Sequence, residues 1–409
     1  MANRVGAVFA TAVIVASLFI PAAVSRSFGA TPSKETIKIG FLSSLSGPFA
    51  MLTRYSSPAV QMVFDKVNAS GGMFGKQIQI ITRDDQGDPS VVAQKLSELK
   101  GEGCIAIVGP FLGANGRPAI QWAAANNIPL ITCSSPSISD RVHYNKYTFF
   151  TVPVQDATSE AMLRGMLSKP VKSFYFLGAD IVNAHEMYDY MADKLKRTHP
   201  EIVNLGSVWP SFTNQEFSNI ISAALAKKPD VIIIGQAGPG WAALCQQGMK
   251  FNLFKKARTV GCYMLESAVT ASFGKNYPVG METVGWCPFW EQSKPMQDYL
   301  KEHLALTKVY PADKGIELHL AALGLVAAMK KAGSTDPEAI AGALENLAFD
   351  GPIGPVHFDD YDHQLKIPIW YETTGYSKDF PIAVATHMIK YGDEVYPTKE
   401  EMLALRKAK

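Results

Sequence analysis

The sequence has little excess charge of either sign. Its 409 residues include 39 Lys and Arg against 37 Asp and Glu, so the formal net charge is +2, and no block of like charges occurs. This balance gives no electrostatic reason to expect a nucleic acid or a strongly anionic partner. Apolar residues make up 47% of the chain and charged residues 19%, as in ordinary soluble globular proteins. The length suits two α/β lobes better than one simple core.

Cysteine is also scarce, and its spacing excludes the common metal sites. No C-x-x-C pair and no Cys/His spacing that suits zinc occurs, so we expect no metal. Most of the cysteines lie in apolar runs and are predicted to be small buried hydrophobic side chains. An odd number in a large chain requires no disulfide, and the pairing stays open. The five are Cys104, Cys133, Cys245, Cys262 and Cys287.

Familiar catalytic and nucleotide-binding motifs are missing. Residues 71–76 resemble a phosphate-binding loop but are one residue short and precede a strand, so they are predicted to form a turn. The glycines of 235–240 do not have the dinucleotide-binding spacing. His185-Glu186 lacks the second histidine of a zinc protease helix, and no G-x-S-x-G motif occurs. We therefore expect no enzyme activity and no cofactor, although a catalytic triad assembled only in the fold stays open.

A long apolar run occurs at the N-terminus. Residues 5–20 form an apolar run after Arg4, and Ala23-Val24-Ser25 offers small residues at the positions that a signal peptidase reads. The run approaches the length of a single membrane anchor, but its small-residue exit and polar spacer favour cleavage. No cysteine follows that would carry a lipid. We therefore predict a signal peptide at residues 1–25, cleaved near Ser25, and a periplasmic protein.

The rest of the chain alternates strand and helix patterns. The first strands are predicted at 36–43, 77–84, 104–109 and 129–132. The order β-α-β-α-β-α-β predicts a parallel sheet with right-handed crossovers. After residue 155 the alternation restarts, with strands at 171–177, 203–209, 230–235, 259–263 and 283–289. The fold class is therefore α/β, with two doubly wound parallel-sheet lobes.

The C-terminal part is predicted to return to the first lobe. Helices follow the second winding, and residues 364–373 alternate like a β-ribbon. We expect lobe 1 to comprise residues 36–152 and 291–360, and lobe 2 to comprise 153–290 and 361–409. Three crossings would join the lobes, near residues 151–155, 286–291 and 359–366.

Loops at the carboxyl ends of the strands are the predicted ligand site. Open α/β sheets bind ligands at this edge, where helix N-termini favour an anionic group. The two strongest candidates are the first-lobe loops that begin at Phe111 and Ser134. Weaker candidates are the loops at 43–49, 180–183, 236–240 and 263–266.

Two other patterns have a structural and a functional interpretation. Asp84 and Asp85 could pass for an acid/base pair, but adjacent strand residues point to opposite faces, so a turn or capping role is predicted. Several aromatic residues could form a stacking wall, although core and hinge packing is the default interpretation. They are Trp209, Trp241, Trp286, Phe289 and Trp290.

Five segments resemble one known family. They are IKIGFLSSLSGP (37–48), GGMFGKQIQIITRDDQGDP (71–89), IAIVGP (105–110), NIPLIT (127–132) and GPIGPVHFD (351–359). The chain is similar in these segments to the type I periplasmic solute-binding proteins of ABC importers, in the leucine/isoleucine/valine-binding branch. The resemblance spans nearly all of the chain after the signal peptide. It implies two lobes joined by a three-crossing hinge, a cleft for a small organic solute, and closure read by a membrane permease. We expect a monomer.

The resemblance also implies ligand contacts from lobe 1. In amino-acid-binding members, a serine after the G-P motif holds the α-carboxylate, and that position is here Gly113, preceded by Phe111 and Leu112. The next loop supplies Ser134 and Ser135, and Ser135 stands where a threonine usually meets the α-ammonium.

Lobe 2 is expected to supply the remaining contacts. Asn183 stands where an aromatic residue often covers the ligand, and Tyr263 and Glu266 lie where an acidic partner for the ammonium is expected. These departures leave the ligand open between a branched-chain or other amino acid, an aromatic acid and an amide. Two other functions stay open: a ligand sensor of the same fold, and an exported hydrolase.

Overall fold

The computed structural model describes residues 35–47, 49–53, 56–134, 141 and 145–407. The predicted signal peptide and Ser135 lie outside the described residues. No helix in the described ranges is long and apolar enough to cross a membrane.

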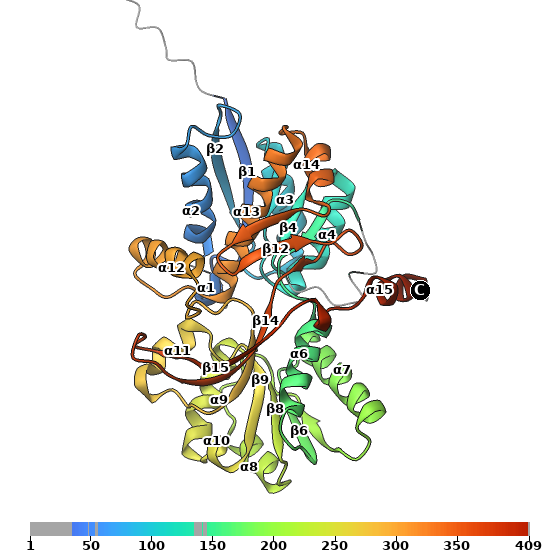
Figure 1. The fold of residues 1–409 in the computed structure, drawn as a ribbon, viewed down its shortest axis with the longest axis vertical. Coiled ribbons are helices and arrows are strands. Elements are labelled where there is room, and N and C mark those ends of the chain that lie inside the picture. The colour runs from blue at the N-terminus through green and yellow to red at the C-terminus, as the bar shows by residue number, and fades with distance from the viewer. Residues whose placement is uncertain (1–34, 48, 54–55, 135–140, 142–144, 408–409) are drawn as a thin grey trace, which may run out of the picture. The chain divides into compact units, whose positions relative to one another are not determined.

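The first sheet contains five strands in the order β2-β1-β3-β4-β5, and all neighbours are parallel. β1 lies between β2 and β3 and is largely buried on both faces, as expected where helices cover a parallel sheet. The strands are β1 (Thr36–Ser43), β2 (Gln77–Asp84), β3 (Ala106–Val108), β4 (Leu130–Thr132) and β5 (Thr148–Phe150). The helices are α1 (Ala50–Thr53), α2 (Ser56–Ala69), η1 (Pro89–Val91), α3 (Val92–Gly101) and α4 (Gly113–Asn126). Figure 1 shows the α-helices of this set beside β1, β2 and β4.

The second sheet contains seven strands in the order β15-β14-β10-β9-β8-β6-β7. Its strands are β6 (Ser173–Gly178), β7 (Val203–Val208), β8 (Val231–Gly235), β9 (Arg258–Cys262), β10 (Glu282–Gly285), β14 (Ile369–Tyr376) and β15 (Ala383–Tyr391). The parallel winding runs from β6 to β10, and β14 and β15 extend it as an antiparallel pair. Its helices are α6 (Gln155–Leu167), α7 (Val182–Thr198), α8 (Ser218–Ala226), α9 (Gly238–Lys250), α10 (Leu253–Lys256), α11 (Ser267–Phe273) and η2 (Gly274–Asn276).

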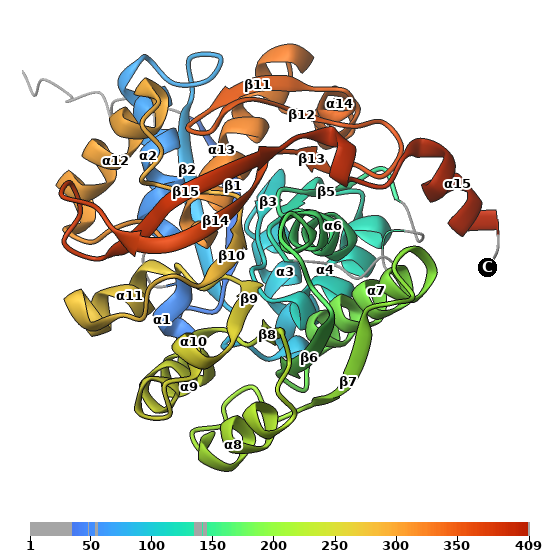
Figure 2. The same ribbon diagram turned by 60° about the horizontal axis from the view of Figure 1, so that its bottom comes forward.

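Late helices pack on the first sheet, as the sequence predicted. His319 of α13 hydrogen-bonds through Nδ1 to the Ala59 carbonyl of α2 at 2.7 Å, and Figure 2 shows both helices beside β1 and β2. These late elements are α12 (Lys294–Thr307), α13 (Asp313–Ala332), α14 (Pro337–Leu344) and a small sheet of β11 (Ala348–Gly351), β12 (Gly354–Phe358) and β13 (Leu365–Lys366). The chain ends with η3 (Asp393–Val395) and α15 (Lys399–Lys407).

Three crossings connect the two sheets: from β5 to α6, from β10 to α12 and from β13 to β14. Arg141 ties the first crossing to the third. Its buried guanidinium lies 3.1 Å from Asp362 Oδ2, and it also donates to Gln364, whose amide donates to the Val152 carbonyl at 3.0 Å. The fold class is thus the predicted one, while the residue boundaries proposed for each lobe stay a prediction.

The Ser-rich loop after β1 is held by the two neighbouring aspartates. Ser44 Oγ donates to Asp85 at 2.6 Å, and Ser46 Oγ and the Leu45 amide donate to Asp84 at 2.5 and 2.9 Å. Burial would raise the pKa of Asp84, yet these hydrogen bonds hold it below its usual value. The predicted structural role of the aspartates is confirmed. The protein itself satisfies these two serine hydroxyls, so the loop is a weaker ligand candidate.

Two further sequence predictions are confirmed. Residues 71–76 form a turn, with Met73 and Lys76 exchanging backbone hydrogen bonds of 2.8 and 3.0 Å. Gly72 has φ +84°, and a Cβ there would lie 2.1 Å from the Lys76 carbonyl oxygen, so only glycine fits. All five cysteines are buried and free of disulfides.

Candidate functional site

Three segments that are distant in the sequence converge on Lys314, in the first turn of α13. The Lys314 ammonium lies 5.6 Å from the ring centroids of Phe111 and Tyr263, and 5.7 Å from that of Trp286. Phe111 follows β3 of the first sheet, whereas Tyr263 follows β9 of the second. The structure therefore brings together two predicted site residues from different lobes.

Lys314 forms an ion pair with Glu317, one turn further along α13. Its Nζ lies 3.0 and 3.2 Å from the two carboxylate oxygens, and the Trp286 indole donates to the same carboxylate at 2.5 Å. Burial disfavours the lysine charge, but Glu317 holds the pKa of Lys314 above its usual value. The Lys314 charge is thus neutralised by Glu317.

The first-lobe end of the site is the start of α4. Leu112 precedes this helix and provides no side-chain cap, and Gly113 is its first residue. Asn115, in the first turn, is fully buried, and neither its Oδ1 nor its Nδ2 has a hydrogen-bond partner among the described residues. An uncapped helix N-terminus presents amide donors and a partial positive charge. Anion binding at Gly113 stays a prediction that this geometry supports.

Ser134 lies next to the first turn of α4. Its side chain is fully buried, and its Oγ lies 2.9 Å from Thr132 Oγ1. A Cβ added to Gly116 of α4 would lie only 2.4 Å from Ser134 Oγ. Ser134 therefore supports the start of α4 directly, and its predicted contact with the ligand stays untested.

The second-lobe residues differ in their surroundings. Asn183 is half-buried in the first turn of α7, and no described contact joins it to Lys314. Glu266 is nearly buried and caps α11, accepting from the Ala268 amide at 3.4 Å. Burial raises the pKa of Glu266 to about 7. Of the two, Glu266 is the one that brings a titratable group near Lys314.

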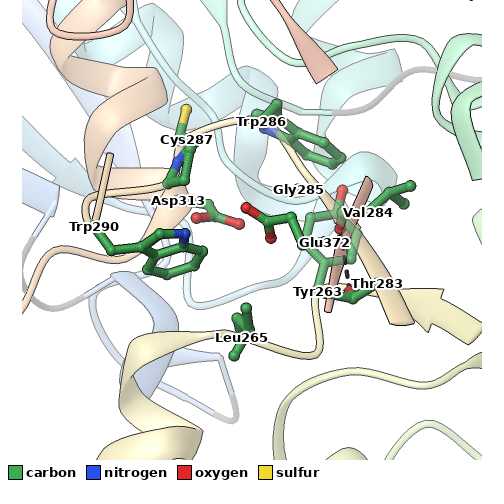
Figure 3. A pocket seen from close by; sticks show the side chains of 11 residues that line it. Tyr263, Leu265, Thr283, Val284, Gly285, Trp286, Cys287, Trp290, Asp313 and Glu372 are labelled. Atoms are coloured by element: carbon green, nitrogen blue, oxygen red, sulfur yellow. Dashed lines mark hydrogen bonds between the residues drawn. The ribbon is translucent and has the colours of Figure 1, made fainter. Parts of the chain in front are cut away.

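A small pocket, with room for about one water molecule, adjoins this cluster at the second crossing. Figure 3 shows the carboxylates of Asp313 and Glu372 pointing toward each other within it. Burial raises the pKa of both groups well above the usual values; repulsion from Asp313 adds to the shift at Glu372, and repulsion from Glu266 and Glu317 adds to the shift at Asp313. The pocket is lined by Tyr263, Leu265, Thr283, Val284, Gly285, Trp286, Cys287, Pro288, Trp290, Asp313 and Glu372.

The aromatic residues divide between the two interpretations that the sequence left open. Trp241 is a core residue whose indole donates to the buried Tyr277 hydroxyl at 2.9 Å. Trp286 and Trp290 instead line the pocket at the crossing. Trp209 stacks on His185 of α7, with ring centroids 3.8 Å apart. Packing at the hinge thus accounts for Trp286 and Trp290, and both side chains also line the pocket.

Sequence reasoning missed Lys314, Asp313 and Glu372. A lysine in the first turn of a helix opposes the helix dipole, and this unfavourable placement was a usable signal. Glu372 directly follows the apolar strand residues I-W-Y, in a strand that is mostly buried, and this charge was a second signal. Their convergence depends on three elements that are far apart in the sequence, and no spacing rule reveals it.

Comparison with known proteins agrees with this architecture. Residues 36–371 match the family model described as periplasmic binding protein. The chain is 25% identical to the Leu/Ile/Val-binding protein BraC3 of Rhizobium johnstonii, over 82% of this chain and 88% of that protein. It is 21% identical to a leucine-, isoleucine-, valine-, threonine- and alanine-binding protein of Pseudomonas aeruginosa, over 84% and 91%.

Solved structures show the same fold. An amino acid ABC transporter substrate-binding protein from Pseudomonas fluorescens Pf-5 superposes with a TM-score of 0.80 at 17% identity, covering 90% of this chain and 98% of that one. A solute-binding protein of an ABC transporter from Rhodopseudomonas palustris BisB5, in complex with 3,4-dihydroxybenzoic acid, gives 0.78 at 15% identity, covering 87% and 97%. With a family match over most of its length and this two-lobe fold, the chain belongs to the periplasmic binding protein family of solute receptors, as the resemblance predicted.

Proposed function

We propose that this protein is the periplasmic receptor of an ABC importer and that it delivers a small organic carboxylate, an amino acid or a related acid, to the permease. Curated relatives named for leucine, isoleucine and valine and a structural neighbour bound to an aromatic acid support this class of ligand. Removal of residues 1–25 would release the receptor into the periplasm. N-terminal sequencing of the exported protein tests that step, and cleavage far from Ser25 would contradict it.

The uncapped start of α4, beside Phe111, is the main support for a ligand that carries a carboxylate. The amides of its first turn have no side-chain cap, and the buried Asn115 side chain has unused donor and acceptor atoms in the described structure. A carboxylate placed there would accept from backbone amides and gain from the helix dipole. Lys314 lies 5.6 Å from the Phe111 ring but is paired with Glu317, so the proposal rests on the helix amides rather than on the lysine charge.

Delivery requires that the closed form bind the solute better than the open form. Only contacts from both lobes provide that difference in affinity. Phe111 and Tyr263 come from the two sheets and contact the same ammonium, so a solute between them would be touched from both sides. The hinge residues Arg141 and Gln364 would then guide closure.

The geometry does not favour a hydrolase. A cysteine nucleophile would have to be ionised, and burial raises the pKa of Cys287, the thiol that lines the pocket, well above its usual value. Ser134 is hydrogen-bonded to Thr132 rather than to a histidine. We therefore expect binding without turnover. A sensor of the same fold would bind the same solutes, and uptake by cells that lack this protein separates the two roles.

The test is a thermal-shift and calorimetric screen of carboxylic acids against their primary amides and methyl esters. One-site binding at one hundred times Kd should stabilise the protein by about 2.7 kcal/mol. We expect acids to stabilise it and their amides to fail. Equal stabilisation by acid and amide would show that no anion site is used at α4.

A further inference from the structure

We propose that Phe49, which follows β1 of the first sheet, and Phe212, which follows β7 of the second, form an aromatic clasp that exists only while the lobes are closed. The clasp determines how long the receptor retains its solute. This effect on a solute rests on the proposed function. The contact between the lobes does not, and it can be tested without a ligand.

The first argument is the contact itself. The ring centroids of Phe49 and Phe212 lie 5.6 Å apart, and the ring planes are tilted by 31°. Aromatic pairs attract each other at this separation. Both side chains are only half-buried even though their rings are in contact. Separating the lobes would therefore expose two large apolar rings to water, which is unfavourable.

The second argument is the position of the contact relative to the hinge. The crossings join β5 to α6, β10 to α12 and β13 to β14. In the second sheet, β7 lies at the opposite end of the strand order from β14 and β15. In the first sheet, β3 and β4 lie between β1 and β5. Since a hinge rotation moves distant parts furthest, we expect opening to separate these two rings.

The third argument is that the first sheet holds Phe49 in place. Asp84 and Asp85 accept the hydrogen bonds that fix the Ser-rich loop ending at this residue. Gly87 has φ +76°, and a Cβ there would lie 2.8 Å from the Phe49 ring and 3.3 Å from Leu112 Cδ1. Phe49 and Leu112 thus pack over the same glycine. Because Leu112 directly precedes α4, the ring lies beside the proposed anion site.

The second sheet holds Phe212 in a similar way. Gln247 of α9 donates from its side-chain amide to the Gln215 carbonyl at 2.6 Å. The Phe212 carbonyl oxygen lies 2.6 Å from the position of a Cβ on Gly240, in the first turn of the same helix. Each lobe therefore presents its ring on an anchored loop. A preorganised contact loses little conformational entropy when it forms.

The clasp should act on release of the solute rather than on its capture. It is absent while a solute enters the open form, and it has to break before the solute can leave. An aromatic pair changes an equilibrium constant by a factor of about two to ten. We therefore expect the clasp to slow dissociation by this factor and to leave association unchanged.

The direct test is cross-linking of the full exported chain without ligand. Phe49→Cys and Phe212→Cys are combined and treated with dibromobimane, which bridges two nearby thiols and fluoresces only after both have reacted. The native cysteines are all buried. We expect strong fluorescence in this variant and background fluorescence in each single variant. The matched control combines Phe212→Cys with Phe74→Cys, since Phe74 is exposed in the turn at 71–76. Fluorescence no higher than in this control, in a variant that unfolds cooperatively, would overturn the proposal.

The second arm measures binding kinetics by stopped-flow fluorescence, with leucine and benzoate as probes. Phe49→Ala and Phe212→Ala should each release a bound probe about two to ten times faster, with unchanged association rates. The double variant should be no faster than the faster single variant, because both remove the same contact. Phe74→Ala should behave as wild type.

Unchanged dissociation in both single variants, or additive effects in the double variant, would overturn the role of the clasp in retention. If no acid of the screen binds, the proposed function fails, and the cross-link still decides whether the clasp forms.

Discussion

Two buried glutamates on one pair of strands have opposite surroundings. Glu282 of β10 accepts from both Nε and Nη2 of Arg258, at 2.9 and 2.5 Å, and also from Lys169 and the Tyr371 hydroxyl. Glu372 of β14 lies across from Thr283 in the same ladder, and its Oε1 has no donor among the described residues. Glu282 and Thr283 are consecutive, so the two carboxylates lie on opposite faces of the sheet.

Both carboxylates have little exposed surface, 3% for Glu282 and 1% for Glu372, and they differ most clearly in their hydrogen-bond donors. Burial opposes ionisation in both. The Arg258 hydrogen bond and the other donors hold the pKa of Glu282 below its usual value, whereas burial and the repulsion from Asp313 raise that of Glu372. The fold provides a full set of donors on one face and leaves a carboxylate without them on the face that lines the pocket. That asymmetry makes Glu372 the carboxylate whose ionisation should respond to a nearby charged group.

The largest loss of stability is expected at Glu282, the carboxylate that accepts hydrogen bonds from Arg258, Lys169 and Tyr371. Glu282→Gln removes the charge that compensates Arg258, and breaking such a buried pair costs about 3 kcal/mol of unfolding free energy. Urea unfolding at pH 7.5 measures this loss. A loss below about 1 kcal/mol would mean that Arg258 is satisfied without Glu282, and the contrast between the two faces would weaken.

Glu372→Gln should act in the opposite direction on the ligand-free protein. We expect the variant to be more stable than wild type by about 1–2 kcal/mol at pH 7.5, because at this pH the wild-type side chain must either keep a proton or bury a charge that lacks a donor. The folded-state pKa of Glu372 is raised, so the wild-type protein loses stability as the pH rises from the unfolded-state value through the folded one. The extra stability of Glu372→Gln over wild type should therefore vanish near pH 4.

The pH series needs a comparison between variants rather than the wild-type curve alone. Burial lowers the pKa of His303 and His319 to about 4, so both destabilise the folded state as the pH falls below about 6.5. This contribution is the same in wild type and Glu372→Gln and cancels in their difference. A stability difference that is constant from pH 4 to 8 would contradict the assigned ionisation of Glu372.

The smallest expected effect is a difference in unfolding free energy between variants of Trp286 and Trp290, which lie at the crossing from β10 to α12. Trp286→Phe removes the indole donor of buried Glu317 and should cost about 1 kcal/mol beyond the change in packing. Trp290→Phe is the matched control, because its indole has no acceptor in the described structure, and should cost less. Chemical unfolding of both variants gives the comparison, and equal losses would show that the Glu317 hydrogen bond contributes nothing.

The fold was predictable because it depends on local patterns. The apolar strands 36–43 and 104–109 and the turn at 71–76 each specify their own conformation, and their order fixes a parallel winding. The antiparallel extension was visible in part, since residues 364–373 alternate. Its pairing with β10 depends on a contact across about ninety residues, which propensity does not encode.

The candidate site was predictable to a lesser extent. Phe111 and Tyr263 follow the carboxyl ends of β3 and β9, so topology alone predicts that they lie at the same edge of the fold. Lys314 lies in α13 and Glu372 in β14, near the C-terminal end of the chain. Where these elements pack depends on contacts with much earlier segments, and local sequence patterns do not specify those contacts. An unpaired buried carboxylate is visible only when every neighbour is known, because the observation consists of a missing donor.

Proton release on binding tests most directly whether Glu372 responds to a bound solute. Burial raises the pKa values of Asp313 and Glu372 above their usual range, and an incoming ammonium would lower those pKa values and favour release of a proton. Calorimetric titration with leucine, in buffers of different ionisation enthalpy between pH 5 and 8, counts the protons. Glu266, Glu317 and Lys314 are present in both wild type and Glu372→Gln, so the difference reports Glu372. We predict release of up to about one proton in wild type and markedly less in the variant, while equal proton exchange in both proteins would contradict the account.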